Sequence, residues 1–157
     1  MKRIALINDV TGYSRCSIAA QLPIISAMGI ECVFVPTAIL SVNTMHPEYY
    51  FDDYTDRMND YIETYKKMKV SFDGIATGFL GSERQIDIVI DFIKTFKKKH
   101  TFVLVDPVMG DHGKLYPTYT TAMQDKMRQL IPYATIMTPN LTELCALLEV
   151  PYPHDII

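Results

Sequence analysis

Polar residues and glycines that can bind a metal ion or a phosphate follow each of five short apolar runs in this sequence. They are Asn8 and Asp9, then Ser41, Asn43 and Thr44, then Gly78, Phe79, Gly81 and Ser82, then Asp106 and Asp111, and last Asn140 and Glu143. Mg²⁺ prefers a few carboxylates together with water, and the amide dipoles at helix amino termini hold phosphate oxygens. The residue types therefore indicate chemistry on a magnesium-bound phosphate ester.

Local structure offers a second explanation for some of these residues, because Asp, Asn, Ser and Gly are also common in turns and helix caps. Asn140 followed by Glu143 fits a capping box, which explains Glu143 as well as a functional role does. Asp9 also fits the start of a turn, and His112 fits an exposed loop better than a catalytic base. Asp106 closes an apolar run directly before a proline, so for this residue a function is the favoured interpretation.

Other common site patterns do not occur in the sequence. There is no GxxxxGK[ST] loop, and no GxGxxG follows the first apolar run, which disfavours P-loop and dinucleotide-binding proteins. The three cysteines have no CxxC or other metal-ligand spacing, and the four histidines are scattered. The pattern favours reduced thiols and gives little support to a His/Cys metal site.

The elements that must position these residues alternate between short β-branched runs and longer stretches with helical spacing, which is typical of βαβ units around a parallel sheet. We expect strands at residues 3–8, 31–37, 72–77, 101–105 and 134–137. Helical spacing is carried by Ile18, Leu22 and Ile25, by Tyr50, Tyr54, Met58, Tyr61, Tyr65 and Met68, by Ile86, Val89, Ile90, Ile93 and Phe96, by Met123, Met127 and Leu130, and by Leu144, Leu147 and Leu148. Because strand carboxyl ends and helix amino ends share one edge of a parallel sheet, the five polar segments are predicted to meet there.

Three local signals refine the helices. Pro23 lies within the first helical stretch and should kink that helix or lie in its first turn. Ser82 and Gln85 have the spacing of a capping box at the start of the third helix. The aromatic stripe of the second helix has helical spacing, so packing in the core is favoured over a stacking platform for bases.

Composition indicates one globular domain, because 157 residues with 48% hydrophobic and 21% charged content can bury a core. The formal net charge of −3 and the scarcity of basic runs disfavour nucleic-acid binding. No apolar run approaches the roughly 20 residues of a membrane span, and Asn8 and Asp9 interrupt the amino end too early for a signal peptide. We therefore expect a soluble, cytoplasmic protein that binds neither nucleic acid nor a membrane.

Several motifs resemble those of the pyridoxal/pyridoxamine kinases of the ribokinase-like superfamily. They are NDVTGYSRCS at residues 8–17, LPI at 22–24, AMG at 27–29, SVNT at 41–44, GFLGS at 78–82, DPVMGD at 106–111 and PNLTE at 139–143. They occur in the family's order and at similar spacing along essentially the whole chain. The resemblance implies a three-layer αβα fold with a mostly parallel central sheet. It also implies ATP-dependent phosphorylation of the hydroxymethyl group of pyridoxal, pyridoxine or pyridoxamine, with Mg²⁺ as cofactor.

The resemblance also assigns roles to particular residues. It implies four substrate-binding residues, namely Asp9, Ser41, Thr44 and Phe79. Phe79 would stack near the pyridine ring, at a position where many family members have Tyr. It implies four residues on the ATP side, namely Asp106, Asp111, Asn140 and Glu143. Asp106 and Glu143 would hold Mg²⁺, with Glu143 acting through a metal-bound water.

One family motif does not occur in the 157 residues: a Gly-x-Gly-Asp element whose Asp is taken to be the catalytic base. We therefore expect residues 1–157 to be the front portion of a single ribokinase-like kinase domain, truncated at the carboxyl end and without its base. Two alternatives stay open: a hydroxymethylpyrimidine kinase of the same superfamily, and a non-catalytic ligand-binding or dimerising module. Superfamily relatives are often dimers, so a homodimer is a further expectation.

Overall fold

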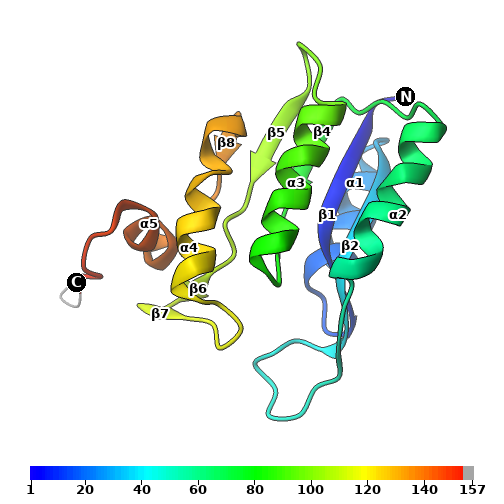
Figure 1. The fold of residues 1–157 in the computed structure, drawn as a ribbon. Coiled ribbons are helices and arrows are strands. Elements are labelled where there is room, and N and C mark those ends of the chain that lie inside the picture. Colours follow the sequence, from blue (N-terminus) through cyan, green and yellow to red (C-terminus); the bar gives the residue numbers. More distant parts are fainter. Residues whose placement is uncertain (154–157) are drawn as a thin grey trace.

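The computed structural model describes residues 1–153, which form a six-stranded sheet with helices on both faces (Figure 1). The strand order is β3-β2-β1-β4-β5-β8, where the strands are β1 (Arg3–Tyr13), β2 (Glu31–Val42), β3 (Phe51–Asp53), β4 (Gly74–Thr77), β5 (Phe102–Val105) and β8 (Ile136–Met137). Neighbouring strands are parallel except for β2 and β3, which are antiparallel. The mostly parallel α/β sheet predicted from the sequence is confirmed.

Helices cover the two faces of the sheet unequally. On one face α1 (Ser17–Ala27) packs against β1 and β2, and on the other α2 (Thr55–Lys67), α3 (Glu83–Phe96) and α4 (Thr121–Arg128) lie in a row (Figure 1). Beside α4 lie α5 (Leu141–Leu148) and a hairpin of β6 (Gly110–Asp111) and β7 (Lys114–Leu115), and a 3-10 turn (Ile131–Tyr133) follows α4. This arrangement directs the carboxyl ends of the parallel strands to one edge.

The third helix forms the centre of the core, as its spacing predicts. Its five predicted core residues are all buried, namely Ile86, Val89, Ile90, Ile93 and Phe96. Phe72, just before β4, packs against Phe96 with ring centroids 5.3 Å apart. Burying an apolar side chain of this size contributes roughly 1.5–3 kcal/mol, so this helix anchors the sheet behind the polar edge.

β1 and β2 are longer than the sequence predicts, because they continue past Asn8 and Thr37. The added residues pair with one another after a register irregularity between Asn8 and Val10. The predicted strands end at polar residues because polar side chains usually lie at the surface. Thr11 and Thr37 are instead buried and hydrogen-bonded, so the strands continue through them. The extension carries the first two strands beyond β4 and builds one wall of the cavity described below.

The second helix begins later than predicted, at Thr55, and the expectation that Tyr50 belongs to its buried stripe is wrong. Residues 51–53 instead pair with β2 as an edge strand, and the Asp53 carboxylate accepts the Thr55 N–H at the helix start. Tyr50 is 66% exposed and Met68 is 68% exposed, so the buried stripe is shorter than its spacing suggests. Met58, at the centre of the helix, is fully buried as expected.

Two smaller expectations are corrected at the other helices, and one is narrowed. The Ser82 hydroxyl accepts the Gln85 N–H, but the Gln85 side chain accepts the Gly81 N–H, so the reciprocal half of the predicted capping box is wrong. Pro23 lies inside α1, beyond its first turn, which leaves a kink as the predicted effect of this residue. Within α5 only Leu147 is buried among the three leucines named above. No helix in residues 1–153 is long and apolar enough to cross a membrane.

Candidate functional site

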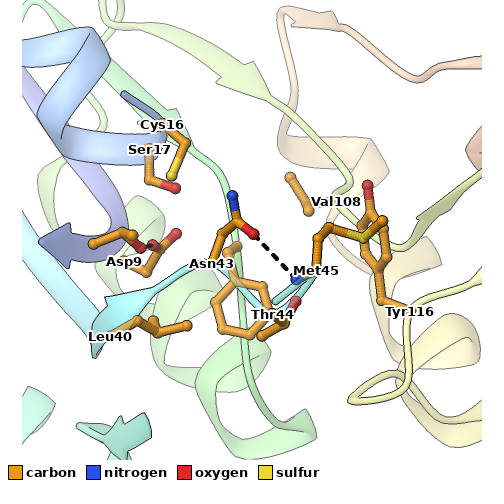
Figure 2. Close-up of a pocket in the computed structure, with 11 residues that line it drawn as sticks. Asp9, Cys16, Ser17, Leu40, Asn43, Thr44, Met45, Val108 and Tyr116 are labelled. Carbon is orange, nitrogen blue, oxygen red and sulfur yellow. Dashed lines mark hydrogen bonds between the residues drawn. The ribbon is translucent and has the colours of Figure 1, made fainter. Parts of the chain in front are cut away.

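A cavity of about 240 Å³ opens at the edge where the parallel strands end. Its walls come from β1, the start of α1, the end of β2 and the loops that follow β2, β4 and β5, and its lining residues are Asp9, Thr11, Cys16, Ser17, Leu40, Asn43, Thr44, Met45, Phe79, Val108 and Tyr116. Figure 2 shows Asp9, Cys16 and Ser17 on one side of this cavity and Val108 and Tyr116 on the other, with Asn43 between them. Three of the four predicted substrate-binding residues therefore meet in one place.

Asp9 is held in this wall by its neighbours on β1. The residue is 5% exposed, and its Oδ2 accepts the Thr11 hydroxyl at 2.5 Å. Its backbone N–H donates to the Asn8 side-chain oxygen at 3.0 Å. A buried carboxylate requires such partners, because an unpaired one would carry a large desolvation cost. The Asp9 carboxylate is therefore a fixed acceptor at the cavity.

Phe79 is one of two aromatic residues that line the cavity, the other being Tyr116, and its peptide group is fixed at both ends. Its N–H donates to Asn8 Oδ1 at 2.8 Å, and its carbonyl oxygen accepts the Thr37 hydroxyl at 2.8 Å. Its ring meets the Phe51 ring edge to face, with centroids 6.3 Å apart. These contacts present one apolar ring to the cavity in a defined orientation.

Thr44 and Ser41 differ in their placement, although the sequence groups them together. Thr44 lines the cavity, whereas Ser41 is not among the residues that do. The Ser41 hydroxyl instead accepts the Tyr50 N–H at 2.8 Å and so closes the loop between β2 and β3. Side chains alternate between the two faces of a strand, which separates Ser41 from its pocket-lining neighbour Leu40.

The second group of predicted residues meets where α5 begins beside β6. The Glu143 carboxylate, 4% exposed, accepts the Met109 N–H at 3.1 Å and the Asn140 N–H at 2.9 Å. Asn140 Oδ1 accepts the Glu143 N–H at 3.0 Å, which completes the capping box that the sequence allowed. Asn140 Nδ2 donates to the Gly110 carbonyl at 2.8 Å. Both side chains therefore tie the loop after β5 to the first turn of α5.

Three carboxylates share this region with a tyrosine. Burial raises the pKa of Asp106, and a hydrogen bond with Thr138 opposes that rise. Burial also raises the pKa of Glu143, and the negative charge of Asp106 adds to the rise. The pKa of Tyr116 is raised by burial and then by the charges of Asp111, Glu143 and Asp106. The charges of the three acids thus all act on one phenol.

Tyr116 links the two groups, and sequence reasoning missed it. It lines the cavity opposite Asp9 (Figure 2), and burial, together with the charges of the carboxylates near α5, raises the pKa of its phenol. Its backbone N–H donates to the Met109 carbonyl at 2.8 Å, in the same loop that Glu143 holds. Its position in the sequence could have indicated a role in the site, since Tyr116 lies in the glycine-containing loop that follows Asp106. The spacing of residues along the sequence does not show, however, that this loop returns to the cavity.

The donor set can be tested against a magnesium ion. In residues 1–153 no three His, Cys, Asp or Glu side chains lie close enough together to hold a metal. Asp106 and Glu143 remain as a pair, and both Glu143 oxygens already accept backbone N–H groups. Mg²⁺ commonly uses one or two carboxylates and keeps several waters, so the pair fits a hydrated ion that Glu143 reaches through water.

The parallel sheet, its two helical layers and the cavity at the strand ends identify this protein as a ribokinase-like α/β protein. A family model described as phosphomethylpyrimidine kinase matches residues 16–155. The chain belongs to this family, which includes the pyridoxal kinases.

Known relatives agree with this assignment. A Bacteroides thetaiotaomicron protein, named as a candidate phosphomethylpyrimidine kinase and crystallised with pyridoxal, is 46% identical with a TM-score of 0.96, over 99% of this chain and 55% of that one. The pyridoxine/pyridoxal/pyridoxamine kinase of Bordetella avium is 32% identical over 149 residues, which cover 86% of this chain and 47% of that protein. The pyridoxal kinase of Leishmania donovani, solved with ADP and pyridoxamine, shares the fold at 20% identity with a TM-score of 0.88, over 94% of this chain and 54% of that one. The chain thus spans about half the length of these relatives.

Proposed function

We propose that this chain forms the vitamin-binding part and one wall of the nucleotide site of a kinase. The kinase would transfer the γ-phosphoryl group of ATP to the hydroxymethyl group of pyridoxal, pyridoxine or pyridoxamine. The observation that carries the proposal is the cavity where Asp9, Thr44 and Phe79 meet, beside the Asp106 and Glu143 carboxylates. Similarity to the Bacteroides protein crystallised with pyridoxal supports the same class of substrate.

The cavity offers complementary groups to a B6 vitamer. The Phe79 ring presents an apolar surface to a flat pyridine. The fixed Asp9 carboxylate accepts a hydrogen bond from the phenol or the protonated ring nitrogen of the vitamer, and the Thr44 hydroxyl can donate or accept. A hydroxymethyl group on the ring would then point towards Tyr116 and the carboxylates behind it.

The acidic region is proposed as the phosphate and magnesium side. Mg²⁺, when bound, neutralises charge that develops on the phosphoryl oxygens. Asp106 would contact the ion directly and Glu143 through water, because its oxygens are already held by backbone N–H groups. Asp111, whose side chain is about half exposed and whose Oδ1 accepts the His112 N–H at 2.8 Å, would face the nucleotide from the rim of this region, outside the pair that holds the ion. Asn140 acts indirectly by fixing the loop between β5 and β7.

Tyr116 lines the cavity, and its phenol can donate a hydrogen bond. Such a bond is strongest to an anionic oxygen. The Tyr116 hydroxyl therefore suits the place between the vitamer alcohol and the transferred phosphoryl group. The residue that deprotonates the alcohol is not assigned within residues 1–157, because the family's Gly-x-Gly-Asp motif does not occur in them.

A hydroxymethylpyrimidine kinase is the second candidate, and the description of the matching family model favours it. Both substrates are small heteroaromatic alcohols, so the same cavity and acidic region would serve either reaction. They differ in the groups around the ring, because a B6 vitamer carries a phenol on a pyridine, whereas hydroxymethylpyrimidine carries an amine on a ring with a second nitrogen. An acceptor such as Asp9 can bind both, which leaves affinity as the discriminating quantity.

Calorimetric titration of the 157-residue chain tests the proposal. The ligands are pyridoxal, pyridoxine, pyridoxamine and hydroxymethylpyrimidine, with ribose as a polyol control. We expect a B6 vitamer to bind at least about tenfold more tightly than ribose, a difference of about 1.4 kcal/mol. Tightest binding of hydroxymethylpyrimidine would favour the second candidate. Equal, negligible affinity for all five would contradict both.

A further inference from the structure

Asn8 connects the two fixed walls of the cavity, although it does not line the cavity itself. It is 5% exposed and belongs to β1, and its side chain reaches the segment after β4 on one side and α1 on the other. Its Oδ1 accepts two backbone N–H groups, from Asp9 at 3.0 Å and from Phe79 at 2.8 Å. These residues are distant in sequence and supply the acid and the aromatic ring of the cavity. One side-chain oxygen therefore binds both.

The Asn8 side chain accepts the first backbone N–H beyond the regular pairing of β1 and β4. The register between β1 and β4 ends at Ile7 and Thr77, and the Gly78 N–H makes a last bond to the Ile7 carbonyl at 2.9 Å. The next N–H, that of Phe79, lies beyond the strand and donates to Asn8. Without this acceptor a partly buried N–H would lose its partner, which is unfavourable because the group has left water without a replacement bond.

Two contacts fix the orientation of the Asn8 amide. Its Nδ2 donates to Gln21 Oε1 in α1 at 3.2 Å, so its oxygen faces the two backbone N–H groups. A Cβ at Gly78 would lie 2.3–2.5 Å from the Asn8 amide atoms, which no side chain could occupy without displacing Asn8. Glycine at this position thus gives the amide its room.

We propose that Asn8 is a positioning residue for the cavity: its oxygen sets the Asp9 carboxylate relative to the Phe79 ring before a ligand arrives. The inference rests on the proposed function, since its effect appears in the affinity for a B6 vitamer. A preformed site binds more tightly because less ordering is needed on binding. Thr37 completes the arrangement by donating to the carbonyl of Phe79 at 2.8 Å.

The test compares three variants by calorimetric titration with pyridoxal. Asn8→Leu removes the acceptor at similar volume, and we expect about tenfold weaker binding, because the Asp9 and Phe79 N–H groups lose the oxygen that orders them before the ligand arrives. Asn8→Asp keeps the acceptor and should bind more tightly than Asn8→Leu. Gln21→Met removes only the outer partner and serves as the matched control, with affinity within about threefold of wild type. Wild-type affinity in Asn8→Leu, or equal losses in all three variants, would overturn the inference.

Amide hydrogen exchange gives a readout that does not depend on ligand binding. In the wild type the Phe79 and Asp9 amides should be protected, and in Asn8→Leu both should exchange faster while the Gly78 amide stays protected by Ile7. If Asn8→Leu does not fold, the wild-type measurement still decides, because fast exchange at Phe79 would contradict the Asn8 bond. If wild type binds no B6 vitamer, the proposed function fails, whereas the exchange pattern separately tests the Asn8 contact.

Discussion

The cavity and the acidic region lie side by side on one edge of the sheet, yet they use their polar residues differently. At the cavity, the Asp9 carboxylate is fixed by Thr11 and by the strands that carry it, which have 11 and 12 residues. At the acidic region, the neighbouring strands β5 and β8 have four and two residues. There the Glu143 carboxylate connects the loop after β5 to the start of α5 by hydrogen bonds. Where the strands are long, their pairing holds the backbone, so the Asp9 carboxylate can bind a ligand. Where the strands are short, the Glu143 carboxylate itself holds the backbone together by hydrogen bonds.

This difference predicts that mutations in the acidic region act mainly on stability and that mutations in the cavity act mainly on affinity. The sign in the acidic region depends on the residue: loss of Glu143 should lower stability, whereas loss of the buried charge of Asp106 should raise it at neutral pH. The following predictions test that separation, beginning with the largest expected effect.

Replacing Glu143 should have the largest effect, and it should act on stability. Glu143→Leu leaves the Met109 and Asn140 N–H groups without their acceptor, so we expect the free energy of unfolding to fall by about 2–4 kcal/mol. Urea denaturation measures this loss. Leu144→Ala, at an exposed position of the same helix, is the control and should change stability by less than about 0.5 kcal/mol. A Glu143→Leu variant as stable as wild type would show that α5 does not depend on this carboxylate.

Replacing Asp9 should act on affinity instead. Asp9→Asn keeps an acceptor for the Thr11 hydroxyl but removes the charge, so we expect pyridoxal to bind about tenfold more weakly with little change in stability. Calorimetric titration measures the affinity, and the exposed Asp60→Asn on α2 removes the same charge far from the cavity. Equal affinities in Asp9→Asn and wild type would remove the proposed role of this carboxylate.

Asp106 should show a pH dependence whose sign follows from its raised pKa. A carboxyl whose pKa is higher in the folded than in the unfolded state stabilises the fold below its unfolded pKa, and this contribution is lost as pH rises through the folded pKa. Asp106→Asn should therefore raise the free energy of unfolding at pH 7 by up to about 1 kcal/mol, with the gain vanishing near pH 4. Denaturation curves at the two pH values measure it. A gain that is larger at pH 4 would have the wrong sign.

The smallest effect is expected at Phe79, where many family members have Tyr. Phe79→Tyr keeps the ring against Phe51 and adds a hydroxyl at the cavity, so pyridoxal affinity should change by no more than about threefold. Phe79→Ala, which removes the ring, is the comparison and should weaken binding by more. Both affinities come from the same titration. Identical affinities for Ala and Tyr variants would show that the ring does not contact the ligand.

The sequence predicts the sheet and the gathering of its polar edge for a clear physical reason. Apolar runs and helical spacing determine which faces are buried, and parallel strands then bring Asp9, Phe79 and Asp106 to the same end. The sequence does not predict the features that depend on contacts between distant segments. Tyr116 is an example, since it reaches the cavity from a loop that Glu143 holds through Met109.

Strand ends show the same limit. We ended β1 and β2 at polar residues because polarity usually indicates exposure, but Thr37 is buried and bonded to the distant Phe79 carbonyl. Ser41 gives a second example: the resemblance predicts a substrate contact, which stays a prediction, and the structure adds a hydrogen bond of its hydroxyl to Tyr50 across the β2–β3 loop. In each case the partner lies in another element, and residue type and local spacing do not reveal it.

The most direct test of the account is to locate pyridoxal on the chain by ¹H–¹⁵N NMR titration. Binding at the cavity predicts that the amide signals of Asp9, Thr44 and Phe79 shift together and saturate with one affinity, while signals near Ser71, at the far end of the sheet, stay in place. Saturable shifts that appear only outside the cavity, or no shifts at any pyridoxal concentration, would contradict the assignment of this cavity to a B6 vitamer.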